Sequence, residues 1–156
     1  METIKINNPL YIGEIAPLIQ RYWDKINVHK LNYISYETLY AYITNTVQYG
    51  GDIAEFWVCL NEDRPVGFAL WSVLPLPFVG TVYCQHIFKT VKDHNVALEL
   101  VKQFVKFGKK HNAPYYMFHS INDVVAKLLV KLAKEVNATT IDLGTTEFIA
   151  RLKENN

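Results

Sequence analysis

The sequence predicts a single α/β (α+β) domain, residues 1–156, in which an antiparallel meander of strands leads into a β-α-β-α-β unit. Two observations predict this fold class. Apolar residues recur at helical spacing before residue 50 and again after residue 95, whereas the segment between reads as three strands. The length suits one domain, and the sequence contains no repeat and no linker.

Two helices are expected in the first 50 residues, after a short strand from Thr3 to Ile6. Pro17 fits only the first turn of a helix, so the first helix should start near residue 13. Ser35 is an N-cap for the second helix, and Gly50-Gly51 ends it.

Three strands are expected next, at residues 54–60, 66–74 and 78–89. A polar turn at residues 61–65 separates the first pair, and Pro75 and Pro77 separate the second pair. Because the connections are as short as those of hairpins, the three strands should form an antiparallel meander.

A helical period returns at residues 95–111, followed by a strand at 115–119, a helix from Ser120 to Asn137, and one or two strands within 139–149. The strand, helix and strand over 78–119 form a crossover, which places the helix N-terminus at the carboxyl end of the strand 78–89. Ligands of open α/β sheets bind at that edge.

Composition excludes several kinds of protein. The formal charge of +1 gives no electrostatic basis for binding nucleic acid or an anionic membrane. No apolar run is long enough for a membrane span, and no secretion signal follows Met1, so we expect a cytoplasmic protein. Cys59 and Cys84 are expected to be buried, reduced thiols, with one disulfide between them as the alternative, and no spacing suggests a metal site.

The loop before the helix 95–111 is the best candidate for an anion site. Free backbone N–H groups and the helix dipole favour a phosphate at a helix start, and Lys92 would add to this, whereas Asp93 opposes it. The alternative is an ordinary strand-to-helix loop in which Asp93 or Asn95 is the N-cap.

Three segments of the chain, considered together with their order in the sequence, resemble the GNAT superfamily of N-acetyltransferases. Residues 92–97 (KDHNVA) match a phosphate loop of the form Gln/Arg-x-x-Gly-x-Gly/Ala, with Asn95 at the middle glycine. Residues 64–68 are similar to the hairpin that enters the family's third strand, and Asn122 matches an asparagine after its fifth strand. The chain would be a divergent member, with a bacteriophage origin as one alternative that its composition fits.

The resemblance implies a mixed sheet whose fourth and fifth strands splay apart to hold acetyl-CoA. The residues it assigns to the cofactor are Ile87, Phe88, Lys92, Asp93, His94, Asn95, Val96, Ala97, Asn122 and Ala126. It implies acetyl transfer to an amine of a small molecule or of a protein.

Catalytic residues are less well defined, because the positions of the family's usual acid tyrosine hold Leu129 and Val130. The candidates are Tyr83 as a proton donor or relay, Gln85 toward the cleft, and His119 as a base. Tyr83 and His119 also have structural alternatives, which are packing for Tyr83 and a capping or other structural role for His119.

Strand alternation places Tyr83 and Gln85 on one face, and Cys84 and His86 on the other. His86 is either a further base or a satisfied histidine beneath a helix. Glu55 opens a strand and is expected to be solvated at the strand edge, with contact to the cleft through water as the alternative.

The replaced glycine at Asn95 and the missing acid tyrosine favour a second hypothesis. The chain would then be a catalytically degenerate GNAT-like binding or structural protein, for example a phage virion or host-interaction protein. A homodimer or a protein partner is compatible with either hypothesis.

Overall fold

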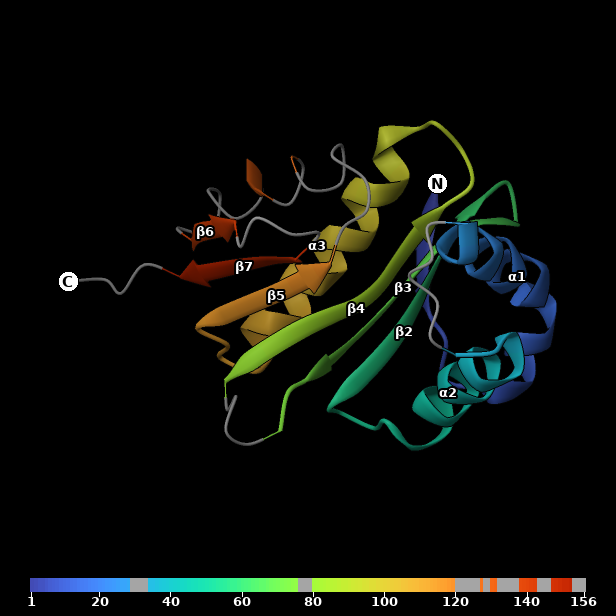
Figure 1. Cartoon of the computed structure of the whole chain (residues 1–156), viewed down its shortest axis with the longest axis horizontal. Coiled ribbons are helices and arrows are strands. Elements are labelled where there is room, and N and C mark those ends of the chain that lie inside the picture. The colour runs from blue at the N-terminus through green and yellow to red at the C-terminus, as the bar shows by residue number, and fades with distance from the viewer. Residues whose placement is uncertain are drawn as a thin grey trace.

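The helices and strands follow the order that the sequence predicts (Figure 1). The computed structural model describes residues 1–28, 34–75, 80–119, 127, 130–131, 138–142 and 147–152. Their elements are β1 (Glu2–Lys5), the 3-10 turn η1 (Pro9–Tyr11), α1 (Ile12–Val28), α2 (Tyr36–Tyr49), β2 (Ala54–Asn61), β3 (Arg64–Val73), β4 (Thr81–Lys89), α3 (His94–Lys110), β5 (Tyr115–His119), β6 (Ala138–Asp142) and β7 (Glu147–Leu152). The helix expected from Ser120 to Asn137 lies largely outside these residues, as do residues 76–79.

The described strands form one mixed sheet in the order β1-β2-β3-β4-β5-β7-β6. β1 to β4 pair antiparallel, as expected for a meander. β4 pairs parallel with β5, and α3 makes the crossover between them. The tail supplies two strands, and β7 inserts antiparallel between β5 and β6.

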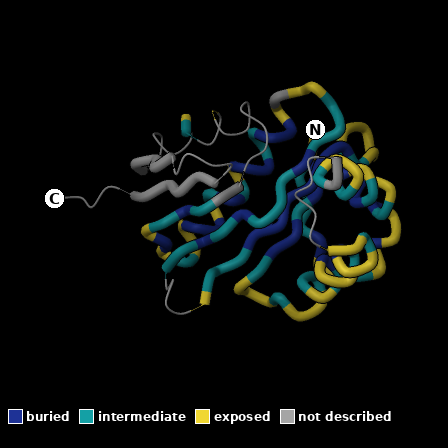
Figure 2. The backbone as a smooth tube through the Cα atoms, viewed as in Figure 1, coloured by how far each residue is buried: buried dark blue, intermediate teal, exposed yellow. Residues whose placement is uncertain are grey.

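Helices cover both faces of this sheet, so that two separate apolar cores form. On one face α1 and α2 pack on β2 and β3 through residues such as Ile19, Ile43 and Phe68. On the other face α3 packs on β3, β4 and β5 through residues such as Leu100, Trp71 and Tyr116. Figure 2 shows burial concentrated in the central strands and exposure on the outer sides of α1 and α2. None of the helices in the described part of the chain is long and apolar enough to cross a membrane.

The first helix departs from the prediction at Pro17, which was expected in its first turn. Helix α1 begins at Ile12, directly after η1, and Pro17 lies inside it. An interior proline removes one helical hydrogen bond. Because Ile15, Leu18 and Ile19 are buried against the sheet, tertiary packing outweighs that loss.

The hairpin between β2 and β3 turns through Glu62 and Asp63, which both have positive φ angles of 49° and 63°. Two left-handed residues make the type I′ turn that suits the twist of a hairpin, a conformation that favours Asn-Gly. Glu62→Asn combined with Asp63→Gly should therefore raise the free energy of unfolding by about 1 kcal/mol. Urea denaturation measures the change, and an unchanged midpoint would contradict the turn geometry.

Candidate functional site

The β4 strand runs on beyond the point where its ladder with β5 ends. In the described residues this ladder begins at Thr81 and ends with the pair Cys84 and Phe118, whereas β4 continues to Lys89 (Figure 1). The rest of β4 pairs with β3 on its other side. The predicted splay of the fourth and fifth strands is confirmed in this sense. Among the described residues, no strand pairs with this edge of β4 beyond Cys84, and we call this part its free edge.

Strand alternation tells which backbone N–H and carbonyl groups of β4 point to that free edge. The N–H of Thr90 donates to the Val66 carbonyl of β3 at 2.9 Å. Since N–H groups alternate along a strand, Phe88 also directs its N–H to β3, and Ile87 directs its N–H and carbonyl to the free edge. An extended ligand can add to β4 there as a further strand would.

A β-bulge in β4 changes which side chains share a face. Leu70 of β3 pairs with His86 and Trp71 pairs with Cys84, so Gln85 is an extra residue. Cys84 lies in the core beneath α3. His86 contacts α1 on the opposite face. The expectation that Cys84 and His86 share a face is therefore wrong, because the bulge interrupts the period of two on which it rested.

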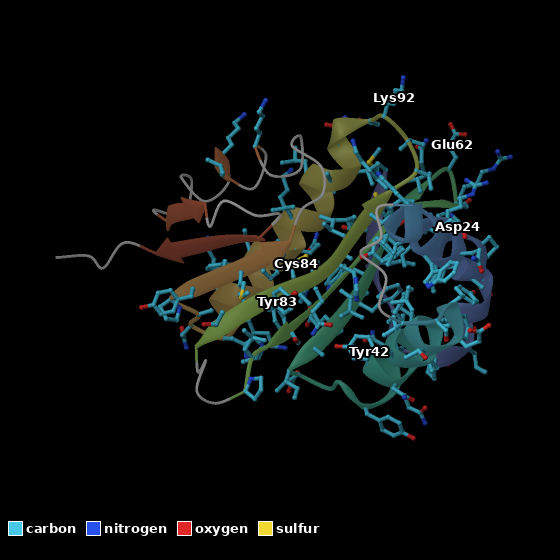
Figure 3. The ribbon with its side chains drawn as sticks, viewed as in Figure 1. Asp24, Tyr42, Glu62, Tyr83, Cys84 and Lys92 are labelled. Carbon is cyan, nitrogen blue, oxygen red and sulfur yellow. The ribbon has the colours of Figure 1, made fainter. Side chains whose placement is uncertain are left out.

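Gln85 is held at both ends of its side-chain amide. Its Nε2 donates to Ser72 Oγ at 2.7 Å, and its Oε1 accepts a hydrogen bond from the hydroxyl of Tyr42 on α2. Figure 3 shows Tyr42 on the side of α2 nearer the strands. These contacts fit a positioning role for Gln85, with the half-exposed Tyr42 hydroxyl beside it.

His86 is held in the same way by α1. Its Nδ1 lies 2.7 Å from the hydroxyl oxygen of Tyr22, and the two rings meet edge to face at 5.4 Å between centroids. Burial raises the pKa of Tyr22 well above its ordinary value, so its hydroxyl keeps its proton at neutral pH. The Tyr22–His86 contact joins residues 64 positions apart in the sequence.

Tyr83 is half-buried on β4, between Ser72 of β3 and Met117 of β5. Because Val82 and Cys84 on either side pack beneath α3, Tyr83 points to the face that α1 and α2 cover (Figure 3). It shares that face with Gln85, as predicted.

The start of α3 is the predicted anion site, and Asp93 is its N-cap. The Asp93 carboxylate accepts the N–H of Asn95 at 2.8 Å, and the Asp93 carbonyl accepts from Lys89 Nζ at 2.9 Å. Val96 and Ala97 are buried in the core, so only their backbone can meet a ligand. Lys92 is exposed beside the helix start (Figure 3).

Four predicted residues have side chains that the structure does not describe. His94 lies at the first position of α3, and His119 ends β5, where it pairs with Glu147. Asn122 and Ala126 lie outside the described residues altogether.

Glu55 is not the solvated edge residue that the sequence suggested. It is the buried charged residue of β2, and its carboxylate accepts from Lys5 Nζ at 3.0 Å, Trp57 Nε1 at 2.9 Å and Trp71 Nε1 at 3.4 Å. Burial raises the pKa of Glu55, but these hydrogen bonds and the Lys5 charge outweigh it and hold the pKa below the ordinary value. Its contacts give it a structural role on the face of α3.

Both cysteines are buried and free, as predicted, and burial raises the pKa of Cys84 to about 12. Among the described residues no group of three or more histidine, cysteine and acidic side chains could hold a metal ion.

Three side chains that anchor the site were missed by sequence reasoning: Tyr22, Tyr42 and Ser72. Tyr22 belongs to the apolar stripe of α1 and so reads as a core residue. Nothing in the spacing of Tyr42 or Ser72 links them to Gln85 before the chain is folded.

Comparison with known proteins finds likeness in structure but not in sequence. Neither the protein-family models nor the curated protein sequences contain a match. A GNAT-family acetyltransferase from Staphylococcus aureus superposes with a TM-score of 0.67 at 13% identity, over 97% of this chain and 99% of that chain.

Two further similar structures contain coenzyme A. Diaminobutyrate acetyltransferase EctA from Paenibacillus lautus, in complex with its substrate and coenzyme A, has a TM-score of 0.65 at 15% identity and covers 99% and 98% of the two chains. PaiA N-acetyltransferase from Thermoplasma acidophilum, in complex with coenzyme A, has a TM-score of 0.60 at 12% identity and covers 99% and 100%. This chain is therefore a divergent protein with the fold of the GNAT acetyltransferases.

Proposed function

We propose that this protein transfers an acetyl group from acetyl-CoA to the amine of a small molecule or protein. The free edge of β4 beyond Cys84, leading directly into the start of α3, carries the proposal. An extended pantetheine arm needs backbone partners, and a pyrophosphate needs free N–H groups, and here the two kinds of group are neighbours in one chain segment.

The residues fit such a donor from one end to the other. Ile87 offers its backbone N–H and carbonyl on the free edge, beside Phe88. The first turn of α3 offers the backbone N–H groups of Val96 and Ala97, with Lys92 nearby as a cation, whereas the N–H of Asn95 donates to Asp93. By the family resemblance we assign His94 to the same phosphate loop, and Asn122 and Ala126 to the pantetheine arm. The bound donor supplies an activated thioester.

The side chains around the bulge are suited to proton transfer. Tyr83 lies on the face of β4 that is next to α1 and α2, where its hydroxyl can protonate a leaving thiolate directly or through water. Gln85 holds the strand at the bulge through Tyr42 and Ser72. His119, at the end of β5, is the proposed base.

Calorimetry with acetyl-CoA and with CoA tests donor binding directly. Release of CoA thiol should then be followed with L-2,4-diaminobutyrate, spermidine and a peptide that begins with alanine as acceptors. We expect saturable donor binding and transfer to at least one class of amine. Absence of binding at millimolar donor would overturn the proposal.

A binding protein without catalysis is the second candidate, and the Asp93 cap favours it. The Asp93 carboxylate accepts the Asn95 N–H, which a bound pyrophosphate would otherwise use. The same carboxylate brings negative charge to the start of α3. A protein that binds no donor, or that binds donor but transfers acetyl to none of the three acceptors, would fit this candidate.

Asp93→Ser should tighten binding of CoA roughly three- to fivefold. Serine remains a good N-cap, whereas the negative charge next to the pyrophosphate is removed. Calorimetry at low ionic strength measures the effect. Glu99→Gln is the matched control, because Glu99 lies further along α3 and pairs with Lys102. Equal affinities of wild type and Asp93→Ser would place the pyrophosphate away from this helix start.

A further inference from the structure

A chain of three neutral polar side chains runs from β3 across the bulge of β4 to α2. Gln85 Nε2 donates to Ser72 Oγ of β3 at 2.7 Å, and the hydroxyl of Tyr42 on α2 donates to Gln85 Oε1. Tyr42 and Gln85 are 43 positions apart in the sequence, so only the fold brings them together. Each of these hydrogen bonds has a direction, and the direction decides what the end of the chain can bind.

The end of this chain at Tyr42 is a hydrogen-bond acceptor. An amide oxygen can only accept, so the single hydroxyl proton of Tyr42 is directed at Gln85 Oε1. The lone pairs of the Tyr42 hydroxyl oxygen then point elsewhere, and no hydrogen bond to that oxygen comes from the part of the chain that the structure describes. Because Tyr42 is 41% exposed, a donor from outside the chain can reach it.

Gln85 lies where the reactive end of a bound donor is expected. It follows Cys84, the last residue of β4 that pairs with β5, so it is the first residue of the free edge. From Gln85 this edge extends to Lys89 at the end of β4, about 13 Å along an extended strand. A donor with its pyrophosphate at the start of α3 and its arm along this edge directs its thioester toward Gln85. The Tyr42 hydroxyl lies beside that end.

We propose that Tyr42 binds the acceptor amine, through an N–H of the amine that donates to the Tyr42 hydroxyl oxygen. Gln85 and Ser72 are positioning residues, because they direct the hydroxyl proton away and leave the oxygen lone pairs to the amine. The inference rests on the proposed function and adds the residue that holds its second substrate. Tyr42 takes up no proton, and His119 remains the proposed base.

This site suits a primary or secondary amine that arrives as an ammonium ion. Alkyl amines are protonated at neutral pH and so have N–H groups to donate. A hydrogen bond from a charged donor is about twice as strong as one from a neutral donor. The exposed part of the Tyr42 ring adds a π face that attracts a cation. The acceptor would therefore enter from the face of the sheet that α1 and α2 cover.

Two analogues of the acceptor isolate the N–H that Tyr42 would accept. The most active of the three acceptors named above is methylated at its reacting nitrogen, to the dimethyl or the trimethyl form. Near pH 6 both forms carry the same charge there, the dimethyl form has one N–H and the trimethyl form has none. Neither form can yield a stable amide.

Calorimetry with these two analogues, on protein saturated with CoA, is the first test and requires no catalysis. The wild type should bind the dimethyl form about tenfold more tightly than the trimethyl form, whereas Tyr42→Phe should bind both alike. A tenfold preference that survives in Tyr42→Phe would overturn the proposal. So would a wild type without any preference.

Steady-state kinetics with acetyl-CoA and the unmethylated acceptor are the second test. Tyr42→Phe should raise the KM for the acceptor about tenfold, with kcat and the KM for acetyl-CoA unchanged. Gln85→Met keeps the length of the side chain without its amide, and we expect a rise of about three- to fivefold. Tyr49→Phe is the matched control, since Tyr49 lies on the same helix and is 74% exposed. It should retain the wild-type values.

A purely structural role for Tyr42, which would be to fasten α2 to the sheet, gives a different result. Tyr42→Phe would then weaken binding of CoA and of both analogues to the same extent, and this outcome overturns the proposal. A Tyr42→Phe variant with the acceptor KM of Tyr49→Phe overturns it as well. In both cases an active wild type leaves the proposed function intact. A wild type that binds no donor or transfers no acetyl overturns the proposed function itself, and the inference with it.

Discussion

Gly67→Ala should lower the free energy of unfolding by about 2 kcal/mol, because there is no room for a methyl group at this position. A Cβ atom there would lie 2.6 Å from Val96 Cγ1 and 2.8 Å from the Phe88 carbonyl oxygen. Since that oxygen belongs to the central sheet, Val96 and the first turn of α3 must give way. The start of α3 would move away from β4. Because these two segments form the proposed donor site, we also expect the affinity for CoA to fall about tenfold.

Urea denaturation followed by circular dichroism measures the stability change, and calorimetry measures the affinity. Gly13→Ala is the matched control, because a Cβ atom at Gly13 meets nothing within 4 Å and the residue lies in the first turn of α1. It should be neutral or stabilising by up to about 0.5 kcal/mol. If Gly67→Ala is as stable as this control, α3 does not pack on β3 as closely as described.

Glu55→Ala should lower the free energy of unfolding by about 3 kcal/mol at neutral pH. The substitution leaves two indole N–H groups, those of Trp57 and Trp71, without their acceptor. It also leaves the ammonium group of Lys5 beside the core without its carboxylate at 3.0 Å. Glu55→Gln retains an acceptor and most of the shape, so we expect a smaller loss of about 1 kcal/mol.

The effect of Glu55 on stability has a definite pH dependence. Its folded pKa is lower than the ordinary value of 4.5, so its contribution is fully present above that value and is lost as the pH falls through the folded pKa. Denaturation of wild type and Glu55→Gln should therefore differ by a constant amount near pH 7, and by less as the pH falls below about 4. A difference that grows toward acid pH would contradict the depressed pKa.

Local patterns were sufficient to predict the elements and their order. Ser35 caps α2, and the helical stripe of α3 appears within one residue of its predicted bounds. These features depend on neighbours within one helical turn, which the sequence presents directly. The loop from Lys92 to Ala97 was predicted as the start of the crossover helix for the same reason, with Asp93 as one of two expected caps.

Two features of the structure required the folded chain. The bulge at Gln85 depends on the register of β3 against β4, and a one-residue shift in register leaves no mark in the residues themselves. Burial of Glu55 depends on Lys5 and two tryptophans that arrive from three different positions in the sheet.

The sequence by itself therefore determined the α/β class, the meander, the crossover and the helix start that can receive a phosphate, because each follows from local spacing and capping. Only the tertiary structure decided that the His86 side chain lies on the face of the sheet that α1 covers, and not beneath α3. On that face it forms a hydrogen bond with Tyr22. The physical reason is that side-chain direction along a strand is a property of pairing with the neighbouring strand. A single extra residue in that pairing reverses it.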